Sequence, residues 1–262
     1  MPAPGWRRTN RSCSKPNSKT PKSKITSMTI SAILFDKDGT LLNFASTFEP
    51  ATARVIDNLS AGDSQLAMAL AQAVDFDLQT QKIRAGSVLI AGSVEEIAQC
   101  WKPHVASEKQ TEITLLVDRL FVEATSLSLV GFPFLVSTLE ALTQKHLPLG
   151  VATNDTETAA HSHLGSLNVE GFFTFVAGSD SGFGAKPGPG MVLGFAEHCG
   201  VEANRVAMVG DSPHDCMAAK AAGALAVGVA SGAMTAQELS NFADVVLNDI
   251  SELPQFIEML GD

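Results

Sequence analysis

Two acidic residues close an apolar run near the start of the sequence. Residues 30–35 are almost entirely aliphatic or aromatic, and Asp36 and Asp38 follow them before a Gly-Thr turn. Two acids at i and i+2 on extended backbone project to the same side, so one can serve as nucleophile or metal ligand while the other carries a proton. An aspartate followed by glycine is also a common turn signal, so on this segment alone a solvated turn stays an open alternative.

A second apolar run, 205–210, ends in the same way. Asp211 follows it directly, and Asp215 comes four residues later at the start of a predicted helix. Carboxylates that converge at strand ends suit Mg²⁺, a hard cation that takes few protein ligands and keeps water and substrate oxygens. Asp211 or Ser212 is also expected to cap the helix, and one residue can cap and coordinate.

Two further segments offer groups that bind phosphate. Thr153 and Asn154 follow the apolar run 149–152, and Lys186 lies in a loop rich in glycine and proline. A phosphoryl dianion needs hydroxyl, amide and ammonium donors of this kind. Taken singly, Thr153 is an ordinary strand-end hydroxyl and Lys186 a solvated lysine; their co-occurrence with the aspartates favours a site.

The elements that must position these residues follow an alternating pattern. Apolar runs alternate with amphipathic stretches, which is typical of strands and crossover helices in a parallel sheet. The expected fold is therefore α/β, a doubly wound parallel sheet, whose ligands bind at the carboxyl ends of the strands. Strands are expected at 30–35, 149–153, 173–177, 205–210, 224–229 and 244–247, with helices at 133–146, 156–167, 189–199, 213–222 and 250–260.

The stretch between the first two strands is far longer than a crossover requires. Helical patterns at 50–59, 64–74, 94–101 and 111–124 predict an inserted helical cap over residues 48–130. The catalytic core then comprises 29–47 and 131–262. Residues 1–28 are rich in Ser, Pro and Lys and predict a disordered basic tail; a targeting or nucleic-acid-binding segment, or a true start at Met28, are the alternatives.

Charge and cysteine usage limit the classes of partner. Seven of the 18 basic residues lie in 1–28 with no acidic one, so 28 acidic residues face 11 basic ones in the rest of the chain. Such a body repels nucleic-acid backbones and anionic membranes, which leaves a small phosphorylated metabolite as the expected partner. The four cysteines are scattered, and no apolar run is long enough to span a membrane, so a cytoplasmic location is expected. The oligomeric state is left open.

Together, the four segments resemble the motifs of the haloacid dehalogenase superfamily. Asp36-x-Asp38-Gly-Thr, Thr153, Lys186-Pro and the Gly-Asp211 segment occur in the family's order and in the expected strand context. The resemblance covers about 29–46 and 132–262 and is closest to phosphoglycolate-phosphatase-like members, because a helical insert follows the first motif.

The resemblance implies a Mg²⁺-dependent phosphatase that acts through an aspartyl phosphate. Asp36 would attack phosphorus, Asp38 would move protons, and Thr153 and Lys186 would hold the phosphoryl oxygens. The metal would take Asp36, the main-chain carbonyl of Asp38, Asp211 and, directly or through water, Asp215. A sugar phosphomutase and a non-catalytic binding module on the same fold are the alternatives, whereas dehalogenase chemistry is disfavoured because that branch lacks an acid at Asp38.

The sequence assigns no catalytic role to three kinds of residue. Lys37 is expected to point away from Asp36 and Asp38 under strand alternation. Arg84 in the cap could contact an anionic leaving group, although a solvated arginine is the favoured interpretation. His163 and the other histidines show no metal-ligand spacing and are read as surface or helix-end residues.

Overall fold

A computed structural model of the chain describes residues 29–107 and 110–261. Its centre is a parallel sheet of six strands in the order β5-β4-β1-β6-β7-β8. The prediction of a doubly wound α/β fold is confirmed, and the predicted tail 1–28 lies outside the described residues. The strands are β1 (Ala32–Phe35), β4 (Leu149–Ala152), β5 (Phe175–Ala177), β6 (Val206–Gly210), β7 (Leu225–Val229) and β8 (Val245–Leu247).

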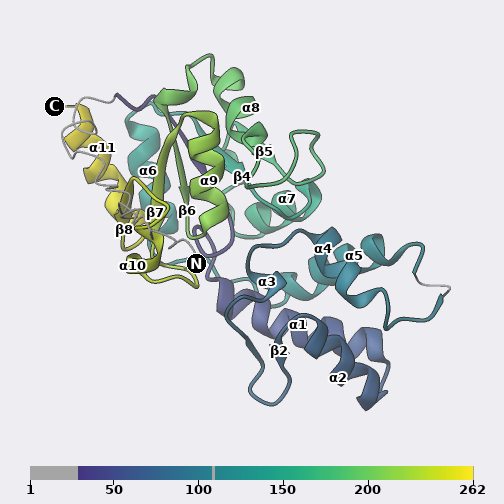
Figure 1. Cartoon of the computed structure of the whole chain (residues 1–262). Helices are drawn as coiled ribbons and strands as arrows, with labels where there is room; N and C mark the ends of the chain where they lie inside the picture. The colour runs from purple at the N-terminus through teal and green to yellow at the C-terminus, as the bar shows by residue number, and fades with distance from the viewer. Residues whose placement is uncertain (1–28, 108–109, 262) are drawn as a thin grey trace, which may run out of the picture.

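Helices cover both faces of this sheet (Figure 1). One face packs on an apolar cluster that includes Leu139 and Phe256, and the other on a cluster that includes Phe195 and Cys216. All four residues of β1 are buried, as a central parallel strand covered on both faces requires. The helices of this part are α6 (Leu135–Gln144), α7 (Glu157–Ser166), α8 (Gly190–Cys199), α9 (Pro213–Ala222), α10 (Ala236–Leu239) and α11 (Leu253–Gly261).

The register of the central strands brings the sequence motifs together. β1 pairs with β4 on one side and β6 on the other, with Phe35 opposite both Val151 and Val209. Because all three strands run in parallel, the segments that follow them leave the same edge of the sheet. The residues after Phe35, Ala152 and Gly210 therefore meet there, at the order reversal where α/β sheets bind ligands.

Between β1 and β4 the chain builds a mostly helical body with its own core, which lies to one side of the sheet (Figure 1). Trp101, with 0% exposure, stacks on Phe121 at a centroid distance of 6.0 Å and donates to the carbonyl of Leu70. We call this body the cap. Its elements are α1 (Phe44–Ser60), α2 (Ser64–Ala73), β2 (Phe76–Asp77), β3 (Lys82–Ile83), α3 (Val88–Ala91), α4 (Val94–Trp101) and α5 (Ile113–Ser126).

Helix α1 begins before its predicted start. The sequence pattern predicted a helix over 50–59, but the side chain of Asn43 accepts a hydrogen bond from the amide of Ser46 and caps the helix there. Pro50 lies inside the helix, in its second turn, where its missing N–H removes one intrahelical hydrogen bond. The predicted cap boundary at residue 48 thus falls within α1.

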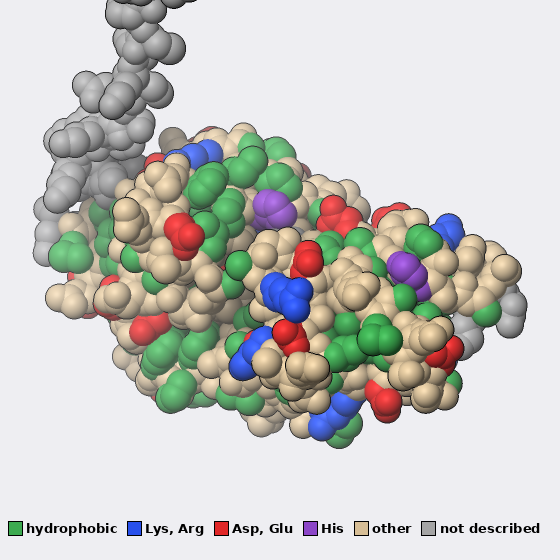
Figure 2. Space-filling view, turned by 60° about the horizontal axis from the view of Figure 1, so that its bottom comes forward, with side chains coloured by type: hydrophobic (Ala, Val, Ile, Leu, Met, Phe, Trp, Pro, Cys, Tyr) green, Lys and Arg blue, Asp and Glu red, His purple; other side chains and the backbone are tan. Residues whose placement is uncertain are grey.

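On the face drawn in Figure 2, acidic, basic and hydrophobic side chains of the described residues are interspersed, without one large patch of a single sign. None of the helices in the described part of the chain combines the length and apolar character needed to cross a bilayer.

Candidate functional site

The turn after β1 is shaped by a close approach between Gly39 and Asp211. The amide of Asp36 donates to the carbonyl of Val209, which extends the pairing of β1 with β6 by one residue. The chain then turns at Gly39, whose φ of 85° favours glycine, and a Cβ atom there would lie 2.3 Å from Asp211 Oδ2. The hydroxyl of Ser231 donates to the carbonyl of Gly39, so a loop after β7 also fixes this turn.

Asp36, Asp211 and Asp215 form a buried group of three carboxylates. One oxygen from each lies within 4.8 Å of the others. Burial raises the pKa of Asp36 to about 6, with Asp215 adding to the rise and Lys186 opposing it. Burial and the neighbouring Asp36 raise the pKa of Asp211 well above its ordinary value. Three converging hard oxygen donors that repel one another fit a divalent cation such as Mg²⁺.

Lys186 is the cation that this group has within the described residues. Its Nζ atom donates to Asp36 Oδ1 at 2.6 Å, to Asp215 Oδ1 at 2.6 Å and to the carbonyl of Ala152 at 2.8 Å. Burial opposes the charge, yet Asp215 and Asp36 outweigh it and raise the pKa of Lys186 above its ordinary value. Lys186 is therefore a permanent cation that can screen Asp36 from an incoming anion.

Thr153 and Asn154 lie beside Lys186, where the sequence placed them. Thr153 is 1% exposed, and its hydroxyl accepts from the amide of Asp155. The side chain of Asn154 makes a reciprocal pair with the main chain of Lys186, with distances of 2.8 and 3.0 Å. Asn154 thus holds the Lys186 loop in place, in addition to the substrate contact that the sequence predicted.

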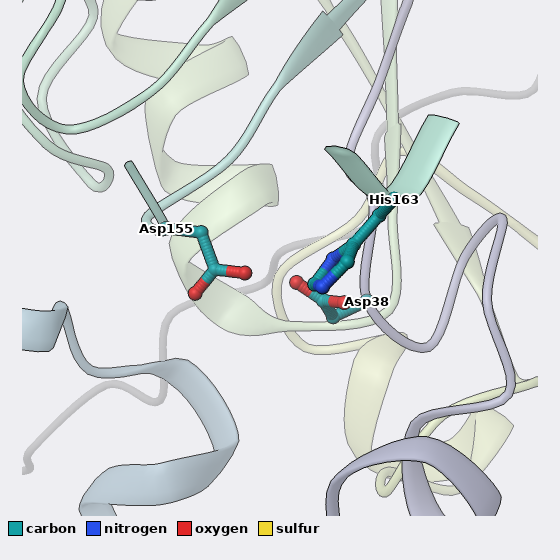
Figure 3. A group of neighbouring side chains, drawn as sticks. All are labelled: Asp38, Asp155 and His163. Carbon is teal, nitrogen blue, oxygen red and sulfur yellow. The ribbon is translucent and has the colours of Figure 1, made fainter. Parts of the chain in front are cut away.

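Asp38 belongs to a different group from the metal-fitting trio, together with Asp155 and His163 (Figure 3). Both of its carboxylate oxygens accept from Lys37 Nζ at 2.6 Å. Burial raises the pKa of Asp38 to about 7, with Asp155 and Asp36 adding to the rise and Lys37 opposing it. A carboxyl that titrates near neutrality suits proton transfer in both directions.

The prediction that Lys37 points away from Asp38 is wrong. Lys37 is 0% exposed, and its Nζ atom contacts Asp38, Asp155 at 2.8 Å and His163 Nδ1 at 3.0 Å. Strand alternation gave the wrong direction because β1 ends at Phe35, so its period does not extend to residues 36–38. Burial alone would lower the pKa of Lys37, but Asp155 and Asp38 outweigh it and raise the pKa.

His163 is likewise not a surface residue. It is 2% exposed, and its Nε2 atom lies 2.6 Å from the hydroxyl of Thr125 on the cap helix α5. Burial and Lys37 lower the pKa of His163 to about 3, which keeps the ring neutral. The sequence could have indicated Asp155, because it comes two residues after Thr153, just as Asp38 comes two residues after Asp36. No such indication exists for His163, since only the packing of α7 brings it to Lys37.

The two groups flank a pocket between the sheet edge and the cap. The cap side is apolar, whereas the sheet side carries the polar groups described above. Among the described residues that line it, Lys186 is the only cation. Arg84 lies outside the pocket, with 62% side-chain exposure, and donates to Asp77. The apolar wall consists of Phe44, Phe48, Leu89, Ile90, Val94, Ile97 and Phe121.

Comparison with known proteins adds three likenesses. Phosphoglycolate phosphatase of Escherichia coli (strain K12) is 29% identical over 233 residues, which cover 86% of this chain and 91% of the relative. The crystal structure of a hydrolase from Pseudomonas syringae is 22% identical, with a TM-score of 0.64 over 87% of this chain and 98% of the other. β-Phosphoglucomutase from Clostridium difficile is 18% identical, with a TM-score of 0.64 over 88% of this chain and 97% of the other.

The two solved structures share the fold, and the family match is broader than the motifs alone. Residues 30–223 match the family described as haloacid dehalogenase-like hydrolase, a range that contains every predicted site residue. The chain therefore belongs to the haloacid dehalogenase-like hydrolases, and it is a phosphatase of that family.

Proposed function

We propose that the protein hydrolyses a small phosphate monoester in two steps, through a phosphoryl group carried on Asp36. The observation that carries this proposal is the contrast between two acids only two residues apart. Asp36 lies in a group with Lys186 and two further carboxylates, whereas Asp38 has its own partners and a pKa raised to about 7. Such a pair, divided by environment, supports a nucleophile beside a proton carrier.

In the first step a carboxylate oxygen of Asp36 forms a bond to phosphorus while the bond from phosphorus to the ester oxygen breaks. Asp38 gives its proton to the departing oxygen. In the second step Asp38 takes a proton from water, whose oxygen attacks the aspartyl phosphate and releases inorganic phosphate. Lys186 and Thr153 hold the phosphoryl oxygens, and Lys186 reduces the repulsion between Asp36 and the substrate.

Mg²⁺ would be held by Asp36, Asp211, Asp215 and the main-chain carbonyl of Asp38. The cation would supply positive charge that offsets the carboxylates and the phosphoryl group at the buried site. Asp215 already accepts from Lys186 and from the amide and hydroxyl of Ser212, so its orientation is fixed by the protein. These three hydrogen bonds leave the Asp215 carboxylate about one free acceptor position, which would be available to the metal directly or to a water on it.

The role of each acid is tested by trapping phosphate on the protein. Asp36→Asn should abolish turnover and labelling, because an amide cannot attack phosphorus. Asp38→Asn should slow turnover by about 10² to 10⁴ and accumulate label at Asp36 when the substrate is 4-nitrophenyl phosphate, whose leaving group needs little acid. Labelling at another residue, or near-normal turnover in Asp36→Asn, would contradict the mechanism.

The pocket also supports a choice of leaving group. The sequence does not distinguish phosphoglycolate, sugar phosphates and nucleotides as substrates. A carboxylate or second phosphate on the leaving group needs a cation to meet it. The described lining offers only Lys186, which already serves Asp36 and Asp215, and it also includes the carboxyl groups of Asp38 and Asp155. An uncharged leaving group with an apolar face is therefore the substrate class we propose.

A matched pair of esters isolates the effect of charge. Phosphoglycolate and its carboxamide differ in one group, and the amide should show the higher kcat/KM by at least about 10-fold, a difference of roughly 1.4 kcal/mol. Benzyl phosphate should exceed both, because its ring can pack against the apolar wall that includes Phe44 and Phe48. A preference for phosphoglycolate would overturn the substrate class while leaving the phosphatase mechanism intact.

A phosphomutase is the second candidate, because β-phosphoglucomutase shares the fold. The two activities separate cleanly in one assay. Incubation with a sugar 1-phosphate and a trace of the bisphosphate, followed by ³¹P NMR, should show inorganic phosphate from a phosphatase. Accumulation of the 6-phosphate isomer in preference to inorganic phosphate would instead establish a mutase.

A further inference from the structure

A buried chain of hydrogen bonds joins Asp38 to the cap, and no step of the proposed reaction uses its inner members. The chain runs from Asp38 through Lys37 to Asp155 and His163, and from His163 to Thr125 on α5. Figure 3 shows three of its members, Asp38, Asp155 and His163. Lys37 and Thr125 are 0% exposed and His163 is 2% exposed. Polar groups at such depth cost free energy unless every partner is in place.

The direction of each hydrogen bond follows from the chemistry of the donors. An ammonium group only donates, so His163 Nδ1 must accept from Lys37, and the proton of the neutral ring lies on Nε2. Nε2 therefore donates to the hydroxyl of Thr125, which in turn donates to the carbonyl of Phe121 at 2.6 Å. The three protons of Lys37 match its three partners, which leaves this lysine one orientation.

Two helices of the cap contact this chain of hydrogen bonds. The ring of Phe48 on α1 lies with its centroid 5.5 Å from Lys37 Nζ and packs edge-on against His163. Thr125 lies in the last turn of α5, and its carbonyl accepts from the amide of Ser128, whose hydroxyl donates to the carbonyl of Thr47 on α1. The position of the cap relative to the sheet is thereby linked to the ammonium group that holds Asp38.

From this geometry we propose that Lys37 is a positioning residue, which fixes the carboxylate of Asp38 toward the leaving oxygen, and that the His163–Thr125 hydrogen bond ties this orientation to the cap. The proposal rests on the proposed function, since it needs Asp38 to be the proton carrier. The hydrogen bonds of Lys37 Nζ go to Asp38, Asp155 and His163 and to none of the three metal-fitting carboxylates. Its charge also opposes the rise that burial causes in the pKa of Asp36, but its geometric influence on the reaction passes through Asp38.

The test compares two esters of similar shape that depend differently on Asp38. Benzyl phosphate has a poor leaving group that needs the proton, and 4-nitrophenyl phosphate has a good one that does not. Lys37→Met should lower the single-turnover rate of leaving-group release by about 10²-fold for benzyl phosphate and by less than about 10-fold for 4-nitrophenyl phosphate, with KM little changed. This rate reports the first step alone, whereas hydrolysis of the aspartyl phosphate needs Asp38 with both esters. Equal losses on both esters, or none, would overturn the proposal.

A second pair of variants keeps the test decisive if Lys37→Met does not fold. Thr125→Val removes the hydroxyl that His163 donates to, whereas Thr52→Val removes an equally buried cap hydroxyl that has no hydrogen-bond partner among the described residues. Thr125→Val should slow benzyl phosphate selectively, by about 3- to 10-fold, and Thr52→Val should match the wild type on both esters. Identical behaviour of the two variants would remove the link to the cap.

Failure of the proposed function gives a different result. In that case the wild-type protein itself would release no phosphate from either ester and take no label at Asp36. Failure of the positioning role leaves both wild-type activities intact and shows only in the variants. The two proposals are therefore distinguished by the same set of measurements.

Discussion

At the scale of single residues, the site is organised around two buried lysines, each of which serves two carboxylates. Lys186 joins Asp36 to Asp215, and Lys37 joins Asp38 to Asp155. Removing one member of such a buried pair costs roughly 3–5 kcal/mol because it strands the opposite charge. The division keeps Asp36 and Asp38, the proposed nucleophile and proton carrier, on separate cations although they are only two residues apart.

Gly39 should prove indispensable to this arrangement, and the cap provides its control. Gly39→Ala places a Cβ 2.3 Å from Asp211 Oδ2, whereas Gly62 has a similar φ of 88° and no atom within 4 Å of an added Cβ. Both substitutions cost about 1–2 kcal/mol of backbone strain. Only Gly39→Ala should also displace Asp211 and lower kcat, by about 10²-fold. Similar kcat values for the two variants would show that Asp211 tolerates movement.

At the scale of elements, the sequence predicted the sheet well and the network around Asp38 poorly. Buried runs such as that of β6 and helix starts such as Pro213 are local signals, and strand ends in a parallel sheet meet at one edge by topology. This is why the sequence alone could predict that one site contains Asp36, Thr153, Lys186 and Asp211. The same logic failed for Lys37, because its direction depends on a turn beyond the strand.

Contacts across elements carried no signal in the sequence. His163 and Thr125 lie on α7 and α5, 38 residues apart, and nothing in either helix marks them as partners. The start of α1 was also missed, because the predicted pattern began at residue 50, whereas the side chain of Asn43 caps the helix before Phe44. Packing between an inserted body and the sheet that it interrupts has no period that a sequence pattern can reveal.

The separate core of the cap predicts that it can be destabilised selectively. Phe121 in α5 and Phe256 in α11 are both 7% exposed, but they belong to different apolar clusters. In a Trp6→Phe background, Trp101 fluorescence reports on the cap and far-UV circular dichroism on the whole chain. Phe121→Ala should lower the urea midpoint of fluorescence, reflecting a loss of about 3–5 kcal/mol, while Phe256→Ala should act mainly on the circular dichroism. Coincident shifts in both variants would indicate one cooperative unit.

At the scale of the whole molecule, the protein is a sheet and a cap that meet over a concentration of negative charge. Asp36, Asp38, Asp155 and Asp211 all line the pocket, and the described part of the chain is acidic overall. Folding must therefore bring together carboxylates that repel one another more strongly in the folded protein than in the unfolded chain. Two lysines offset part of this cost, and the proposed cation would offset the rest.

This predicts that Mg²⁺ stabilises folding more near neutral pH than in mild acid. The pKa of Asp36 is raised from 3.8 to about 6 and that of Asp211 is also raised, so the metal-free folded state keeps protons that the unfolded state has lost. Their contribution to stability is present at low pH and is lost as pH rises through the folded pKa values. Mg²⁺ binds the ionised carboxylates and restores that loss, whereas below about pH 5 it must compete with protons. His163, whose pKa is lowered, is not one of the proposed metal ligands, so its contribution is expected in both arms of the comparison.

The measurement is the difference in Tm between Mg²⁺ and EDTA at about pH 5 and about pH 7.5. With free Mg²⁺ near 100 times its Kd, the gain at the higher pH should approach about 2.7 kcal/mol, several degrees in Tm, and at the lower pH it should be clearly smaller. Asp211→Asn supplies the control, because it removes one ligand and one raised carboxyl together, and its gain should be small at both values. A gain in the wild type that is equal at the two pH values would mean that the metal does not bind the carboxylates of Asp36 and Asp211.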